Sequence, residues 1–147
     1  MEKQNLQLMD LGRLMHEIMC AFKKRFDSQP DIEIRLSTEQ FSLLHAITQK
    51  DVDVIQKDMA EKMGKDKSAI LRLIDSLEEK GLVRRVAALE DRRKNYLMVT
   101  KLGTRVVDSN MKIVLQVMSE IQEGLTQEEI ATFQKVVGHL RSNAAKL

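Results

Sequence analysis

The chain has 147 residues, of which 43% are hydrophobic and 31% charged, and its net charge is +2. This length suits one domain with a substantial hydrophobic core. No apolar stretch approaches the roughly 18 residues of a membrane span, and no secretory signal pattern is present. A single cysteine, Cys20, excludes an intramolecular disulfide and fits a reducing cytoplasm. We therefore expect a cytoplasmic protein that does not associate with membranes.

The basic residues are concentrated in the middle of the chain. Residues 57–105 contain 13 Lys and Arg and 8 Asp and Glu, a net charge of +5, whereas the rest of the chain has a net charge of −3. Such a cluster is typical of nucleic-acid binding. Trp is absent and aromatic residues make up only 3% of the chain, which argues against stacking on single-stranded bases. We therefore expect the partner to be duplex DNA and not a single strand.

The first part of the chain predicts three helices. Residues 4–26 have apolar side chains every three or four positions, and the polar stretch around Pro30 predicts a loop after them. Ser37–Gln40 form a capping box that opens a second helix ending near Gln49. A short third helix is predicted over residues 55–63, with Ile55, Met59 and Met63 on one side.

Residues 64–81 predict the helix that carries most information about function. Its buried stripe and its polar face lie on opposite sides of a helical wheel, and two glycines bound it. The stripe consists of Ile70, Leu73, Ile74 and Leu77, the polar face of Lys65, Ser68, Arg72, Asp75 and Glu79, and the bounding residues are Gly64 and Gly81.

The charges of this helix run against its dipole, which favours acidic residues at the start and basic ones at the end. Lys65 and Lys67 stand at the start, with Asp66 as a candidate cap, and Glu78 and Glu79 stand at the end. For an isolated helix, an ordinary solvated face explains this distribution. Lysines at a helix start are also suited to approaching phosphates.

A β-hairpin with a basic tip follows directly and favours the DNA-binding interpretation. Leu82–Ala87 and Asn95–Val99 alternate as strands, and Asp91-Arg92-Arg93-Lys94 lies near the turn. Two short helices, a glycine turn, a polar-faced helix and a hairpin match a winged helix-turn-helix. We assign residues 37–100 to this DNA-binding part, with Arg84, Arg92 and Lys94 as phosphate contacts.

Two further helices are predicted after the hairpin. One covers residues 101–123 and ends at Gly124, and the other follows a second capping box at Thr126–Glu129. Their apolar stripes, like that of residues 4–26, exceed what a small winged helix can cover. We therefore expect one domain over residues 1–147, mainly α with a small β-hairpin wing, in which residues 1–30 and 101–147 form a homodimer interface.

Four segments carry a resemblance to a known family. They are Leu36-Ser37 with Gln40-Phe41 and Leu44; Met59-Ala60 with Met63-Gly64; Leu77–Val83 with Arg85; and Asp91-Arg92-Arg93 with Leu97, Thr100 and Gly103. In this order and spacing, the chain resembles the MarR family of bacterial transcriptional regulators over nearly its whole length. The D-x-R wing followed by L-x-x-T-x-x-G is the most specific part.

The resemblance implies a homodimeric regulator, expected to be a repressor, that binds a palindromic operator and responds to a small phenolic or other aromatic effector. Ser68 and Arg72 would reach bases or nearby phosphates in the major groove. Arg93 would enter the minor groove, and Asp91 would hold the wing in shape. Family members often have a small polar residue where this chain has Leu71, which could contact a thymine methyl or, as we favour, pack against the preceding helix.

Cys20 and the histidines allow other functions. His16 and Cys20 could share a helix face as metal ligands, but a structural histidine and a buried cysteine fit the pattern better. Cys20 could also be a redox-sensing thiol, which is one alternative function, and a protein-interaction module without DNA binding is another. No phosphate loop, catalytic carboxylate pair or nucleophile motif is present, so we expect neither an enzyme nor a cofactor.

Overall fold

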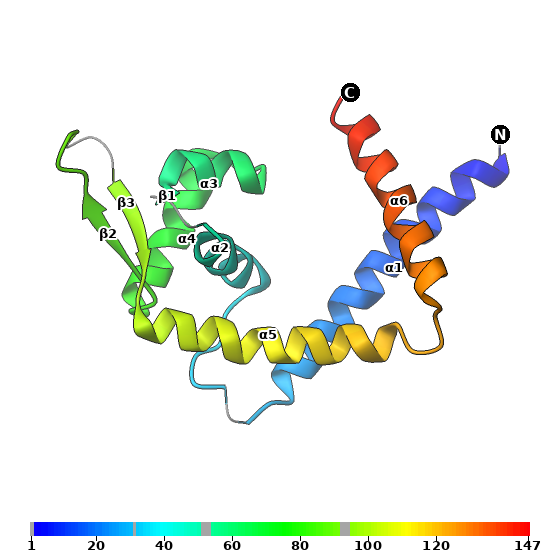
Figure 1. Ribbon diagram of the computed structural model, residues 1–147, viewed down its shortest axis with the longest axis horizontal. Helices are drawn as coiled ribbons and strands as arrows, with labels where there is room; N and C mark the ends of the chain where they lie inside the picture. Colours follow the sequence, from blue (N-terminus) through cyan, green and yellow to red (C-terminus); the bar gives the residue numbers. More distant parts are fainter. Residues whose placement is uncertain (1, 31, 51–53, 92–94) are drawn as a thin grey trace. The chain divides into compact units, whose positions relative to one another are not determined.

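The computed structural model describes residues 2–30, 32–50, 54–91 and 95–147, with side chains described from residue 9 onward. Within these residues the protein is mainly helical, with one small antiparallel sheet, as predicted (Figure 1). In chain order the elements are α1 (Glu2–Asp27), α2 (Thr38–Thr48), β1 (Val54–Ile55), α3 (Gln56–Met63), α4 (Lys67–Glu79), β2 (Val83–Ala87), β3 (Asn95–Val99), α5 (Lys101–Ile121) and α6 (Gln127–Ala144).

The chain forms two compact units, Met1–Val114 and Leu115–Leu147, so that the division falls within α5. The first unit contains the hydrophobic core, in which α2, α3, α4, the sheet and the first turns of α5 meet. Its fully buried side chains include Leu43, Leu44, Met59, Ile70, Ile74, Leu77, Leu82 and Val83. The predicted stripe of α4 therefore faces the core, with Leu73 partly buried against it.

The sheet has one strand more than the predicted hairpin. The strand order is β1-β3-β2, and β1 pairs with β3 through Val54 with Leu97 and Ile55 with Tyr96. The prediction that Ile55 begins the third helix is therefore wrong. Its backbone is extended (φ −100°, ψ 143°), because it pairs with β3 before α3 begins at Gln56.

Helix ends follow the sequence signals. In both predicted capping boxes, at Ser37 and at Thr126, the cap side chain and the residue three positions later bond each other's backbone N–H groups. Hydrogen bonds from the backbone N–H and the hydroxyl of Thr126 lower the pKa of Glu129. Gly81 has φ +72° after α4, and Leu82 N–H donates to Leu77 O (2.9 Å), which closes a Schellman motif between two fully buried leucines.

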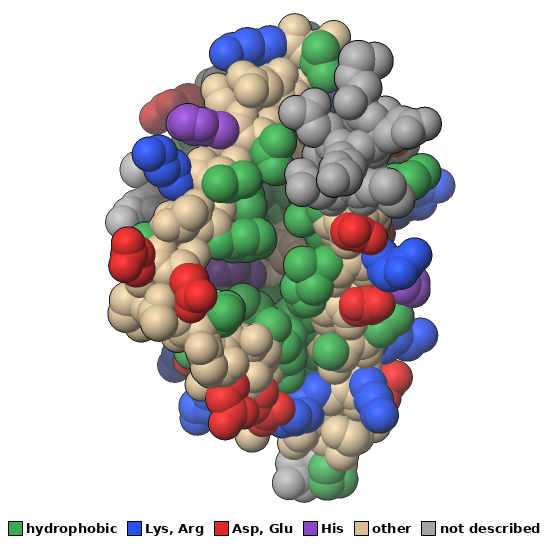
Figure 2. Space-filling model, turned by 90° about the vertical axis from the view of Figure 1, so that its right-hand side faces the viewer, with side chains coloured by type: hydrophobic (Ala, Val, Ile, Leu, Met, Phe, Trp, Pro, Cys, Tyr) green, Lys and Arg blue, Asp and Glu red, His purple; other side chains and the backbone are tan. Residues whose placement is uncertain are grey.

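The second unit consists of the last part of α5 and the whole of α6. No side chain of α6 is buried, and its apolar residues Phe133 and Val136 are 54% and 51% exposed. In the first unit α1 exposes Met15 and Met19 as well. Figure 2 shows hydrophobic side chains open to solvent on one face of the molecule. Among the described helices, none is long and apolar enough to cross a membrane.

Candidate DNA-binding surface

The helix-turn-helix is formed by α3, a left-handed glycine and α4. Gly64 ends α3 with φ +60°, and Lys65 N–H donates back to Ala60 O (3.1 Å). Asp66 then caps α4, because its carboxylate accepts a hydrogen bond from Ala69 N–H (2.8 Å). This carboxylate lies where the helix dipole favours negative charge and compensates the lysines on either side of it.

The outer face of α4 presents the side chains predicted to bind DNA. Ser68, Arg72 and Asp75 are all exposed, and their spacing of four and three residues places them in one stripe along the helix. Lys67 is the first residue of α4 and is exposed too. A hydroxyl and a guanidinium in such a stripe can donate hydrogen bonds to base edges, and a lysine at the helix start can reach a phosphate.

One residue of the predicted surface, Lys65, has a charged neighbour within the protein. Lys65 Nζ lies 2.5 Å from Glu39 Oε1 of α2, and only 29% of the Lys65 side chain is exposed. Leu71 is partly buried. A second polar contact between α2 and α4 joins Gln40 Nε2, the donor, to Ser76 Oγ at 2.8 Å. These contacts hold α4 against α2.

The structure describes the two strands of the wing and the loop between them as far as Asp91. Arg84 is exposed on β2, where it pairs with Met98 of β3, and Asp91 is partly buried. The predicted tip residues Arg92, Arg93 and Lys94 lie outside the described residues.

Arg85 of β2 forms contacts with α4 that the sequence analysis did not predict. Its guanidinium bonds Glu78 through Nη1 (2.5 Å) and Asp75 through Nη2, and its backbone N–H donates to Glu78 Oε1 (3.0 Å). Although partial burial opposes the charged form, the hydrogen bonds and charges of Asp75 and Glu78 together raise the pKa of Arg85. The acidic end of α4, which the helix dipole disfavours, is thus neutralised from β2. The sequence signals for this contact were the mismatch of the acidic residues with the dipole and the place of Arg85 in the pattern that resembles the MarR family.

A cavity of about 450 Å³ lies in the first unit between α1, α2 and α5. Its walls are largely apolar, with three phenylalanines, and the polar groups include Lys23 and Asn110. The lining residues are Met19, Phe22, Lys23, Phe26, Asp27, Leu36, Ser37, Thr38, Phe41, Ser42, Asn110 and Val114. Asn110 is 4% exposed, and its Nδ2 donates to Val106 O (2.6 Å). A cavity of this size and composition can hold a small aromatic molecule.

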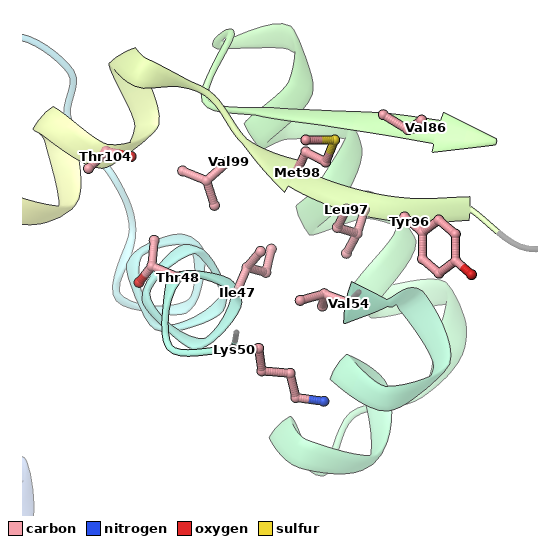
Figure 3. A pocket seen from close by; sticks show the side chains of 10 residues that line it. All are labelled: Ile47, Thr48, Lys50, Val54, Val86, Tyr96, Leu97, Met98, Val99 and Thr104. Atoms are coloured by element: carbon pink, nitrogen blue, oxygen red, sulfur yellow. The ribbon is translucent and has the colours of Figure 1, made fainter. Parts of the chain in front are cut away.

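A wider hollow of about 820 Å³ lies beside the sheet. Figure 3 shows Leu97 of β3, Val54 of β1 and Ile47 of α2 directed toward one another below β3, and Tyr96 at the end of the strand. The three apolar side chains are almost fully buried and belong to the core. This hollow therefore lies along the edge of the core that anchors the wing.

His16 and Cys20 come together on α1, with 3.5 Å between His16 Nε2 and Cys20 Sγ. Both are exposed, so the expectation of a buried cysteine is wrong. Only one side of α1 packs against other residues of the protein, and His16 and Cys20 lie on another side of the helix. In the described part of the chain, no three His, Cys, Asp or Glu side chains are grouped in a way that could hold a metal ion.

Comparisons with known proteins agree with this geometry. Residues 36–94, which span the winged helix-turn-helix, match the sequence model of the MarR family. The chain is similar to the crystal structure of an organohalide-sensing transcriptional regulator bound to 2,4-dichlorophenol, with TM-score 0.81 and 17% identity over 97% of this chain and 82% of that one. It is similar to a MarR family protein from Bacillus stearothermophilus, with TM-score 0.77 and 19% identity over 99% and 98% of the two chains.

A third similar structure is CouR from Rhodococcus jostii bound to p-coumaroyl-CoA, with TM-score 0.72 and 26% identity over 88% of this chain and 87% of that one. All three share the present fold along most of its length. The sequence match to the MarR family thus covers the winged helix-turn-helix segment, residues 36–94, and the likeness of the remainder of the chain to these proteins is one of fold.

Proposed function

We propose that the protein is a homodimeric repressor that binds a palindromic site in duplex DNA and releases it when a small aromatic effector binds. The observation that carries this proposal is the exposed stripe of α4, where Ser68 and Arg72 stand free of the core and Lys67 begins the helix. Arg72 and Ser68 read bases in the major groove, while Lys65 and Lys67 contact phosphates. Arg92, Arg93 and Lys94 extend the contacts from the wing, with Asp91 shaping it.

The dimer is supported by apolar side chains that one copy of the chain leaves in water. Met15 and Met19 of α1, Leu115 of α5, and Phe133 and Val136 of α6 are between 42% and 63% exposed. Because α6 buries none of its own side chains, a second copy is the natural cover for it. A two-fold dimer presents two α4 helices, which matches a palindromic site.

The effector site in this proposal is the cavity between α1, α2 and α5. Phe22, Phe26 and Phe41 can enclose an aromatic ring, Lys23 supplies a positive charge, and Asn110 Oδ1 is an acceptor for a ligand hydroxyl. Similar proteins were crystallised with 2,4-dichlorophenol and p-coumaroyl-CoA, which supports a phenolic or related effector. Because the cavity touches both α1 and α2, an occupant can shift the DNA-binding part relative to α1.

Thiol chemistry at Cys20 is a second candidate function, favoured by its exposure and by the nearby imidazole of His16. The test is DNA binding before and after mild hydrogen peroxide, with Cys20→Ser as the matched variant. Loss of DNA binding by the unmodified protein alone would support a redox-sensing regulator. Equal responses of the two proteins would exclude this second candidate.

Selection from a random duplex pool tests the main proposal. The protein is expected to enrich one sequence with two inverted half-sites about 10 base pairs apart from centre to centre. Electrophoretic titration should then show one dimer on each site. Enrichment of no motif, or binding that depends on salt but not on sequence, would contradict the proposal.

A further inference from the structure

The contact between Arg85 and α4 joins the two DNA-binding elements of the proposed function. Asp75 and Glu78 are three residues apart on α4, and one guanidinium reaches both of them. Glu78 also accepts from the backbone N–H of Arg85 at 3.0 Å. The strand is therefore fixed to the helix by its main chain and by its side chain together. A planar guanidinium that forms two charge-assisted bonds allows little rotation of either partner.

The position of Arg85 along β2 makes this contact important for the wing. Of the five residues of β2, only Val83 is buried, and Arg84, Val86 and Ala87 are exposed. After Val83 the strand has little apolar anchoring of its own, and the next buried residue is Ala88, just beyond its end (4% exposed). Arg85, whose side chain is 21% exposed, fixes the strand to α4 between these two buried residues.

The same contact ends at the DNA-facing stripe of α4. Asp75 follows Ser68 and Arg72 in that stripe. The guanidinium of Arg85 therefore bonds to the helix on the side that carries the proposed base contacts. A shift of the wing relative to α4 would separate the two parts of one DNA site. Simultaneous contact in two grooves requires that this distance be fixed.

We propose that Arg85 is a positioning residue that holds the wing at a fixed place relative to α4, so that both elements bind one DNA site as a rigid unit. The inference rests on the proposed function, because it requires that α4 and the wing both bind duplex DNA. It does not require Arg85 to touch DNA.

Three variants test this inference on the selected site. Arg85→Gln removes the ion pairs but leaves two carboxylates unpaired near the DNA. The triple variant Asp75→Asn, Glu78→Gln, Arg85→Gln removes the ion pairs without leaving a charge, and it remains informative if Arg85→Gln does not fold. Arg84→Gln removes an exposed arginine from the opposite face of the same strand. Because Arg84 is a proposed phosphate contact, this variant should lower the affinity for the selected site and for random DNA equally.

The measurement is the ratio of affinities for the selected site and for a random duplex, together with footprints in both grooves. Arg85→Gln and the triple variant should each lower this ratio by about tenfold. Hydroxyl-radical protection in the minor groove should be lost, while guanine N7 protection in the major groove persists. Thermal unfolding of the triple variant should remain cooperative.

Two results would overturn the inference. If the triple variant keeps the unmodified ratio and both footprints, Arg85 only neutralises the carboxylates of α4. If both protections weaken together, the wing is not positioned separately by Arg85. A failure of the unmodified protein to prefer any site would instead refute the proposed function along with this inference.

Discussion

The hydroxyl of Thr100 donates a hydrogen bond of 2.6 Å to the carbonyl oxygen of Gly81, and so joins the end of β3 to the turn that follows α4. The backbone N–H of Thr100 also donates to Leu82 O (3.0 Å), and Gly103 N–H donates to the Thr100 hydroxyl (3.0 Å). Thr100 therefore caps α5 and closes the base of the wing at the same time. This geometry explains why threonine and glycine stand three residues apart in the L-x-x-T-x-x-G pattern.

Gly103→Ala should destabilise the protein through this same junction. A Cβ at this position would lie 2.2 Å from Leu82 O and 2.8 Å from Val99 Cγ1, and the carbonyl cannot move without breaking its bond from Thr100 N–H. The expected loss in the free energy of unfolding is about 1–3 kcal/mol. Chemical denaturation at a fixed protein concentration measures it.

Gly138→Ala is the matched control for that substitution. Gly138 lies within α6 with nothing within 4 Å of an added Cβ, so alanine should stabilise the helix by about 0.5–1 kcal/mol. If Gly103→Ala were as stable as the unmodified protein, the close approach between α5 and Leu82 would not exist in solution.

Phe133→Glu should weaken the homodimer. Phe133 is 54% exposed on a helix that buries none of its side chains, and a carboxylate at an apolar interface would lose its hydration. Analytical ultracentrifugation should show dissociation to monomers at concentrations where the unmodified protein is dimeric. Ser142→Glu adds the same charge on the opposite side of α6 and should leave the dimer intact. Equal dissociation of both variants would argue against this helix face as the interface.

A tryptophan placed in the cavity should report effector binding. The chain has no Trp, so Phe22→Trp introduces one fluorophore among the lining residues. Titration with 2,4-dichlorophenol is expected to give a saturable fluorescence change and, over the same concentrations, to lower the affinity for the selected DNA site. Leu89→Trp, at a fully exposed position, is the control and should not respond. The same response from both variants would mean that the cavity is not the binding site.

Arg93→Ala should abolish most DNA binding while leaving the thermal midpoint almost unchanged. An ion pair with Asp91 at the surface would contribute only about 0–1 kcal/mol to folding, whereas the guanidinium is the proposed minor-groove contact. Asp91→Ala should have an intermediate effect, since the arginine would remain on a less ordered wing. Residual binding should fall steeply with salt, as expected for phosphate contacts alone. Anisotropy titrations at two salt concentrations measure all three proteins.

Local signals in the sequence were sufficient for most of the helices. The capping boxes at Ser37 and Thr126 and the glycines at 64 and 81 act within a few residues of themselves, and the structure confirms each as a helix start or stop. The periodic apolar residues of α4 likewise identified its buried face correctly. Such features depend on local backbone geometry and side-chain spacing, which a sequence displays directly.

Features that depend on distant residues could not be predicted. β1 has only two residues, and Val54 and Ile55 are extended because Leu97 and Tyr96, about forty residues later, pair with them. The bonds of Arg85 to Asp75 and Glu78 depend on how β2 lies on α4, and the exposure of Cys20 depends on which side of α1 is covered. Periodicity and charge spacing contain none of this information.

The outer face of α4 is proposed to read bases, and titration of the Arg72→Ala variant with DNA examines this role. The variant should lose about 1–3 kcal/mol of binding free energy on the selected palindromic site and less on a random duplex of equal length. Lys67 is a proposed phosphate contact, so Lys67→Ala should lower the affinity for both duplexes alike and serves as the control. If Arg72→Ala bound the selected site as tightly as the unmodified protein, the exposed stripe of α4 would not read DNA bases and the proposed function would be wrong.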